Sequence, residues 1–175
     1  IRRQRQMCIR DRINTTVSKI ITEIERKGDP ALRNYTMQYD KFDIRYKGLT
    51  VDQKEINIAY SSCDSGLRNA LHNAAERIAD FHKKQIPENL EYLDKNKIFL
   101  GSRWSALDSV GLYVPGGTAA YPSSVLMLAI PAKVAKVRNV SMCVPCPNGF
   151  INQSVLVAAK IAKVNKIYKI GGAQA

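Results

Sequence analysis

Two glycine pairs stand at positions where the backbone can come close to a ligand. The pairs 116–117 and 171–172 follow the apolar runs 110–114 and 167–170, respectively. Because glycine has no Cβ, a chain that turns there can approach a phosphate closely, and a helix that comes next offers free N–H groups to an anion. The pattern favours the ligand-binding edge of a dinucleotide-binding unit, although glycine pairs also occur in tight turns that bind nothing.

Two side chains at this edge suit a dinucleotide. Tyr113 is one residue before the end of its apolar run and can present its ring to a flat base or to nicotinamide. Gln174 follows the second glycine pair and can donate or accept hydrogen bonds. The GxGxxG fingerprint is absent, and the end of the run 139–144 lacks the carboxylate that usually binds a ribose. We therefore expect a non-standard binding mode, and the sequence does not distinguish NAD from NADP.

The other reactive side chains give weaker indications. Cys143 and Cys146 form a CxxC, but prolines surround the second cysteine and no further zinc ligands lie at matched spacing. We interpret them as reduced thiols at the end of a strand. His72 and Glu76 have the spacing of a metal pair on a helix, but two groups do not make a site. We predict neither catalytic residues nor metal ligands within these 175 residues.

The residues before Asp108 predict a mainly helical region. Apolar residues spaced three and four apart indicate helices over 13–27, 30–39, 51–60 and 65–85. An extended or hairpin segment is expected over 98–107, around Gly101 and Trp104. We therefore treat 13–107 as one mainly helical region and 108–175 as a second unit.

The residues from 108 onward predict a parallel sheet. Short apolar runs indicate strands over 110–114, 139–144 and 167–170. Two helices separate them, the first capped by Ser123 or Ser124 and kinked at Pro131, the second capped by Asn152. Crossovers of this length make the strands parallel, and the continuous run 110–114 is typical of a strand covered on both faces. The fold class is α/β, with a doubly wound sheet that is incomplete because five residues follow the third run.

The net charge of +12 is concentrated at the two ends of the chain. Residues 1–12 carry +4, residues 13–107 carry +2 and residues 108–175 carry +6. A basic surface can attract nucleic acid. We instead expect a solvated surface and no nucleic-acid partner, because no aromatic residues interleave the lysines that we place on outer helix faces, namely Lys133, Lys136, Lys160 and Lys163.

The sequence shows neither a membrane span nor a signal peptide, so we expect a cytoplasmic protein. Its longest apolar run, 125–130, ends at Pro131 and is far too short to cross a bilayer. Residues 1–12 (IRRQRQMCIRDR) have no apolar period and differ sharply in composition from the rest of the chain. We interpret them as a non-native leader.

Five motifs, in order, resemble those of histidinol dehydrogenases. They are GDPALRNYTMQYDKFD (28–43), IADFHKKQ (78–85), VGLYVPGG (110–117), SSVLMLAIPAKVA (123–135) and IYKIGGAQA (167–175). The resemblance covers most of the chain after residue 12. It implies a Rossmann-like fold related to aldehyde dehydrogenases, of which this chain is the N-terminal fragment.

The resemblance also implies an NAD-dependent oxidoreductase of histidine biosynthesis. Members of the family oxidise L-histidinol to L-histidine through histidinal, with two NAD⁺ and a bound zinc, as homodimers whose active sites draw on both subunits. Tyr113 and Gln174 match two positions that contact NAD in the family. The zinc ligands, the Glu-His acid/base pair and the substrate contacts belong to a C-terminal part that comes after Ala175 in the family. We therefore expect the 175-residue chain to be inactive alone.

Two alternatives stay open. A related NAD-dependent dehydrogenase would keep the cofactor site and oxidise another small alcohol or diol. A basic nucleic-acid-binding module would use the charge of +12, and its binding would depend steeply on salt.

Overall fold

The computed structural model describes residues 2–116 and 120–175, without the side chains of residues 2–11 and 47. Gly117, in the first predicted glycine pair, lies outside the described residues. The N-terminal region contains α1 (Arg2–Lys27), α2 (Asp29–Asp40), α3 (Ile44–Lys47), α4 (Gln53–Ser61) and α5 (Ser65–Lys83). The next elements are the two strands of a hairpin, β1 (Leu90–Leu93) and β2 (Phe99–Ser102). The remaining elements are β3 (Ser109–Tyr113), α6 (Pro122–Val134), β4 (Asn139–Cys143), the 3₁₀ turn η1 (Pro147–Gly149), α7 (Gln153–Ile161), β5 (Lys166–Tyr168) and the 3₁₀ turn η2 (Gly172–Gln174).

The four predicted N-terminal helices are confirmed, with two corrections. Helix α1 begins at Arg2 and not at Ile13, because no glycine or proline interrupts the backbone before Gly28. The short helix α3 was not predicted. It begins after Asp43, whose carboxylate accepts a hydrogen bond from the Arg45 backbone N–H at 3.0 Å.

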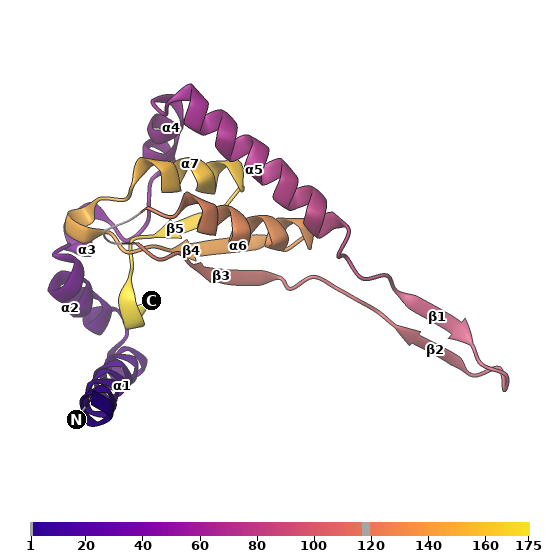
Figure 1. The fold of residues 1–175 in the computed structure, drawn as a ribbon, viewed down its shortest axis with the longest axis horizontal. Coiled ribbons are helices and arrows are strands. Elements are labelled where there is room, and N and C mark those ends of the chain that lie inside the picture. Colours follow the sequence, from indigo (N-terminus) through magenta and orange to yellow (C-terminus); the bar gives the residue numbers. More distant parts are fainter. Residues whose placement is uncertain (1, 117–119) are drawn as a thin grey trace.

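The predicted hairpin exists, but its turn lies earlier than the sequence indicated. Residues 94–98 form the turn because the Asp94 carboxylate accepts hydrogen bonds from the backbone N–H groups of Asn96 and Ile98, each at 2.8 Å. Gly101 is not at the turn but lies within β2, opposite Glu91. The antiparallel hairpin projects away from the rest of the molecule (Figure 1).

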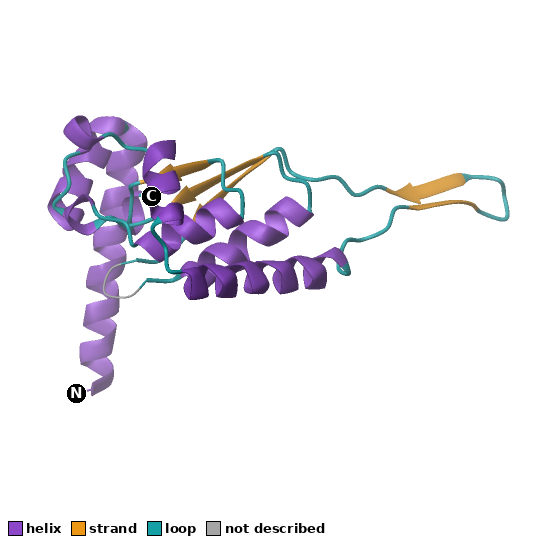
Figure 2. Ribbon diagram, turned by 90° about the horizontal axis from the view of Figure 1, so that it is seen from above, coloured by secondary structure: helices purple, strands orange, loops and turns teal. Residues whose placement is uncertain are grey.

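The parallel sheet is confirmed, with strand order β3-β4-β5. Residues 49–51 pair with the outer edge of the three-residue strand β5 and so widen the sheet. Val51 N–H donates a hydrogen bond to the Ile167 carbonyl at 2.9 Å. Helices α5, α6 and α7 lie on one side of the sheet (Figure 2). The prediction that β3 is covered on both faces is wrong for the described chain, because Gly111 and Tyr113, which alternate with the inward-facing Leu112, are exposed.

The main hydrophobic core joins the N-terminal helices to the sheet. Ile56 of α4 and Leu71 of α5 belong to the same buried cluster as Val125 of α6, Met142 of β4 and Val157 of α7. The boundary predicted at residue 107 is therefore crossed by shared packing, and the division into two units stays a prediction. Among the described residues, no helix is long and apolar enough to cross a membrane.

The ends of the two crossover helices test the predicted caps. Asn152 caps α7 as predicted, since its side-chain carbonyl accepts a hydrogen bond from Ser154 N–H at 2.9 Å. Helix α6 instead begins at Pro122, after Tyr121, so the prediction of a Ser123 or Ser124 cap is wrong. Proline is preorganised for the first helical position, which moves the helix start ahead of both serines. Helix α6 continues through Pro131 to Val134.

The four lysines predicted on outer helix faces occupy two kinds of position. Lys133 and Lys160 lie within α6 and α7, where their ammonium groups donate to the side-chain carbonyls of Asn165 and Asn57 at 2.7 and 2.8 Å. The other two come after the helix ends with positive φ, so their placement on helix faces is wrong; they are Lys136 and Lys163.

Candidate dinucleotide site

The carboxyl ends of the three parallel strands meet at one edge of the sheet. The hydrogen bonds between neighbouring strands continue one residue past the end of β3 and of β4. Val114 N–H donates to the Cys143 carbonyl and Val144 N–H donates to the Tyr168 carbonyl, each at 3.0 Å. Val114 and Val144 are almost fully buried, at 0% and 2% exposure. The segments just beyond the strands are therefore held at fixed positions relative to one another, as a ligand site at this edge requires.

Tyr113 connects the two outer strands at this edge. Its phenolic oxygen accepts a hydrogen bond from the Gly172 backbone N–H at 3.0 Å. Tyr113 is the last residue of β3 and Gly172 lies beyond β5, so the tyrosine side chain reaches across the end of β4. The residue is 44% exposed, and its hydroxyl can still donate a hydrogen bond to a ligand.

Gln174 lies beside the same glycine. Its side-chain Oε1 is 2.6 Å from the point where a Cβ on Gly172 would stand. The residue is only 6% exposed, yet neither Nε2 nor Oε1 has a hydrogen-bond partner within the described parts of the chain. Buried polar groups in native proteins are almost always paired, so this carboxamide calls for a partner beyond the described residues. The structure thus brings the two predicted site residues to one glycine.

The glycines at this edge have packing roles beside the predicted approach to a phosphate, which stays a prediction. A Cβ on Gly171 would lie 2.6 Å from Pro145 Cβ and Cγ, and one on Gly116 would lie 3.3 Å from Pro145 Cδ. Gly172 has φ +67°, which favours glycine, and its N–H is already bonded to Tyr113. The glycines therefore serve the packing of Pro145 and a tight turn. The sequence did not predict this role of Pro145, which stood out only beside Cys146 and at the end of a strand that lacks a carboxylate.

A partly buried polar cluster lies behind the site. Lys169 Nζ is 3.0 Å from Glu55 Oε2, and the lysine side chain is only 8% exposed. Burial, with a smaller contribution from Asp40, raises the pKa of the Cys146 thiol to about 12. Burial also raises the pKa of Asp40, although a hydrogen bond from the Cys146 backbone lowers it in part. Cys143 and Cys146 are free thiols, as the sequence predicted, and the burial of Cys146 makes it a weak nucleophile.

The two histidines contact aromatic residues. His72 Nε2 is 2.9 Å from the Tyr60 hydroxyl, and the His82 ring lies edge-on to Phe81 with 5.3 Å between centroids. Over residues 12–116 and 120–175, no group of three or more histidine, cysteine, aspartate or glutamate side chains could hold a metal ion. The described residues therefore do not fit a zinc site.

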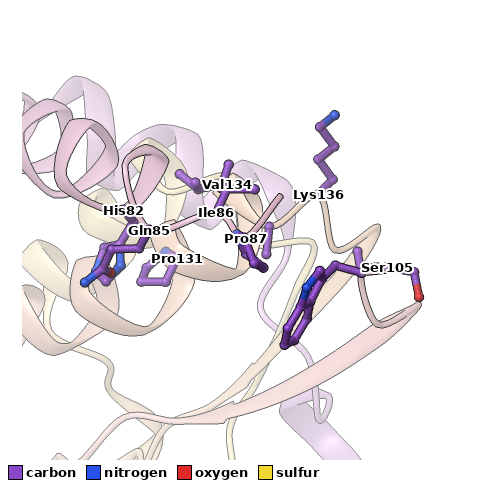
Figure 3. Close-up of a pocket in the computed structure, with 11 residues that line it drawn as sticks. His82, Gln85, Ile86, Pro87, Ser105, Pro131, Val134 and Lys136 are labelled. Atoms are coloured by element: carbon purple, nitrogen blue, oxygen red, sulfur yellow. The ribbon is translucent and has the colours of Figure 1, made fainter. Parts of the chain in front are cut away.

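A separate cavity of about 520 Å³ lies at the root of the hairpin. It is lined by residues from the end of α5, the end of α6 and the segment before β3. Figure 3 shows His82, Gln85 and Pro131 close together, whereas the Lys136 side chain extends away from them. Neither Tyr113 nor Gln174 lines this cavity, so it is distinct from the predicted ligand edge.

Comparisons with known proteins identify relatives along nearly the whole chain. The sequence profile of the histidinol dehydrogenase family matches residues 3–175. Histidinol dehydrogenases from Rhodospirillum rubrum and Agrobacterium fabrum are each 48% identical over 163 residues, which are 93% of this chain and 38% of each relative. The crystal structure of histidinol dehydrogenase from Elizabethkingia anophelis superimposes with a TM-score of 0.85 at 31% identity, covering 93% of this chain and 37% of that one. The chain therefore spans less than two fifths of the length of these relatives.

Proposed function

Because the chain belongs to the histidinol dehydrogenase family, we propose that it forms the NAD side of an enzyme that oxidises L-histidinol to L-histidine. In this proposal Tyr113 and Gln174 bind NAD⁺, and the rest of the active site comes from sequence outside these 175 residues. The full-length enzyme is proposed to be a cytoplasmic homodimer that binds zinc and acts in histidine biosynthesis, as the family resemblance implies.

The buried carboxamide of Gln174 carries this proposal. A glutamine at 6% exposure with both polar atoms unpaired loses hydrogen bonds to water without gaining any in the described chain. Such a loss costs about 1–3 kcal/mol per group. A nucleotide offers the missing donors and acceptors in its carboxamide, ribose and phosphate groups. NAD⁺ at this position would pair the glutamine and recover that free energy.

The geometry gives each residue a separate task. Tyr113 presents a half-exposed ring for stacking and a hydroxyl whose position is fixed by the 3.0 Å hydrogen bond from Gly172. Gln174 supplies directional hydrogen bonds from a side chain that burial holds in place. When bound, NAD⁺ accepts the hydride that leaves the alcohol carbon. The two side chains bind and orient the cofactor, and neither moves a proton.

Zinc has no place among the described residues, which offer no group of three or more suitable ligands. We therefore assign no zinc ligand and no proton-transfer step to this chain. Our proposal for the metal rests on the family alone.

Substitutions at the two proposed contacts test the cofactor site in the full-length protein. We expect Gln174→Leu to raise the Km for NAD⁺ about tenfold, because it removes both polar atoms while keeping a side chain of similar size at this position. Tyr113→Ala should raise the dissociation constant for NAD⁺ with little change in zinc content, measured by titration and metal analysis. Gln85→Leu is the matched control, since Gln85 lies at the hairpin cavity and should leave the Km unchanged.

Unchanged NAD⁺ binding in both variants would refute the cofactor site. The substrate is tested separately, by measuring NADH formed per molecule of alcohol in the full-length protein. We expect two NADH per L-histidinol. Oxidation of another small diol, without oxidation of L-histidinol, would favour the related dehydrogenase instead.

A further inference from the structure

We propose that Pro145, seated against Gly171, is the positioning residue of the cofactor edge, which sets where Tyr113 and Gln174 lie relative to each other. This inference rests on the proposed function for its effect on NAD⁺. Its structural part concerns only the described residues and can be tested without the cofactor.

Residue 171 is glycine because of the space around it and not because of its backbone conformation. Gly171 has φ −127° and ψ −177°, an extended conformation that any residue can adopt. Backbone strain therefore does not require glycine there. Space does, because a Cβ would lie 2.6 Å from two atoms of the Pro145 ring and 2.8 Å from its Cα. Pro145 thus occupies the volume that a side chain at 171 would need.

Pro145 cannot move aside, because both of its neighbours are fixed. The preceding residue, Val144, is 2% exposed and donates its N–H to the Tyr168 carbonyl at 3.0 Å. The next residue, Cys146, is fully buried, and its thiol lies 3.4 Å from the Lys169 carbonyl. Both neighbours are therefore hydrogen-bonded to backbone carbonyls at the end of β5. An added methyl at 171 must displace the turn that begins there and not the proline, because the first two residues of that turn, Gly172 and Ala173, are exposed.

The turn after Gly171 contains Gln174 and donates the hydrogen bond that holds the Tyr113 hydroxyl. Gly172 shares a peptide bond with Gly171, and its N–H makes the 3.0 Å hydrogen bond to Tyr113. Gln174 belongs to the same turn, and its Oε1 lies against Gly172. A shift at 171 therefore moves the Tyr113 hydrogen-bond donor and the Gln174 carboxamide together. Misplacement of binding groups by as little as 1 Å can cost about a hundredfold in activity.

Alanine substitutions at matched glycines provide the test. In the full-length protein we expect Gly171→Ala to raise the Km for NAD⁺ about tenfold with little change in kcat, because binding and not chemistry is affected. Gly111→Ala is the control. It adds the same methyl group on β3, where a Cβ would meet no atom within 4 Å, and the Km should stay within about twofold of wild type. Replacing the proline as well, in Pro145→Gly with Gly171→Ala, removes two of the three close atoms and should lower the Km from that of Gly171→Ala to that of Pro145→Gly alone.

Amide hydrogen exchange in the 175-residue chain tests the structural part without NAD⁺. The Gly172 amide should be protected in wild type and in Gly111→Ala, and should lose protection in Gly171→Ala. If Gly171→Ala does not fold, Pro145→Gly alone decides, because it adds no atom and should still release the Gly172 amide and weaken NAD⁺ binding. A protected Gly172 amide together with an unchanged Km in either variant would overturn the inference. A wild-type protein that does not bind NAD⁺ would instead refute the proposed function, and the amide exchange would still decide the positioning role.

Discussion

Single residues at the edge where the parallel strands end are each positioned by one hydrogen bond or one contact. The Tyr113 hydroxyl is held by Gly172, and the Gln174 carboxamide lies unpaired beside the same glycine. Behind them, Asp40 is 9% exposed, and one oxygen of its carboxylate has no partner among the described residues. Unpaired polar atoms thus occur both at the edge and behind it. Only Gln174 lies at the edge where the strands end, so the two positions should respond differently to substitution.

At the residue scale, Asp40→Asn should stabilise the chain near neutral pH. Burial raises the pKa of Asp40 above 3.8, so the carboxyl binds its proton more tightly in the folded chain than in the unfolded chain. Asp40 therefore favours folding below its unfolded pKa, and this contribution is lost as the pH rises through the folded pKa. We expect the variant to match wild type in acid and to gain roughly 1–2 kcal/mol in free energy of unfolding by about pH 7, measured in urea.

Asp43→Asn is the control, because its effect on the free energy of unfolding near neutral pH should have the opposite sign. A hydrogen bond from the Arg45 side chain lowers the pKa of Asp43. Asp43 therefore favours folding above its unfolded pKa, and that stability is lost as the pH falls through the folded pKa. A loss of stability at neutral pH in Asp40→Asn would contradict the assignment of Asp40 as a costly buried carboxylate.

At the scale of elements, helix starts show how two local signals compete. Asn152 caps α7, whereas Pro122 fixes the start of α6 one residue before Ser123. We expect Asn152→Ala to lower the free energy of unfolding by about 1 kcal/mol, because it removes the acceptor for the Ser154 N–H. Ser123→Ala should change it by no more than about 0.5 kcal/mol, because Ser123 caps nothing. Denaturant unfolding of both variants measures the difference. An equal loss of unfolding free energy in the two variants would show that the Asn152 cap does not stabilise α7.

At the scale of the whole molecule, the projecting hairpin exposes apolar side chains on both of its faces. Leu93 and Phe99 face each other across the two strands and are each 65% exposed. An isolated two-stranded hairpin is marginally stable, and a large exposed apolar surface promotes association. We expect the 175-residue chain to bind a hydrophobic dye, and the double variant Leu93→Glu with Phe99→Lys to reduce the dye fluorescence by about half.

The paired charges in this variant keep the cross-strand contact favourable. A matched double variant, Ile58→Glu with Leu67→Lys, alters two exposed residues on the helices α4 and α5 and should change the fluorescence little. An equal reduction in both would show that the dye does not report on the hairpin.

The order and type of most elements could be predicted from the amino-acid sequence alone, because the signals are local. Apolar spacing, the Asn152 cap and the prolines act within a few residues, and crossover length makes the strands parallel. The parallel sheet also brings Tyr113 and Gln174 to one edge, which the sequence predicted from the two glycine pairs. Where local signals conflicted, as at Pro122 and the two serines after it, the prediction was wrong.

The construction of the proposed cofactor edge became clear only from the folded chain, because its contacts join residues that are distant in the sequence. The bond between Tyr113 and Gly172 spans 59 positions, and the ion pair between Glu55 and Lys169 spans 114. No local pattern encodes such distances. Nor does the sequence indicate that Gly171 is glycine to make room for Pro145 and not to approach a ligand. That distinction depends on which atoms fill the space beside an absent Cβ, which is a property of the tertiary structure alone.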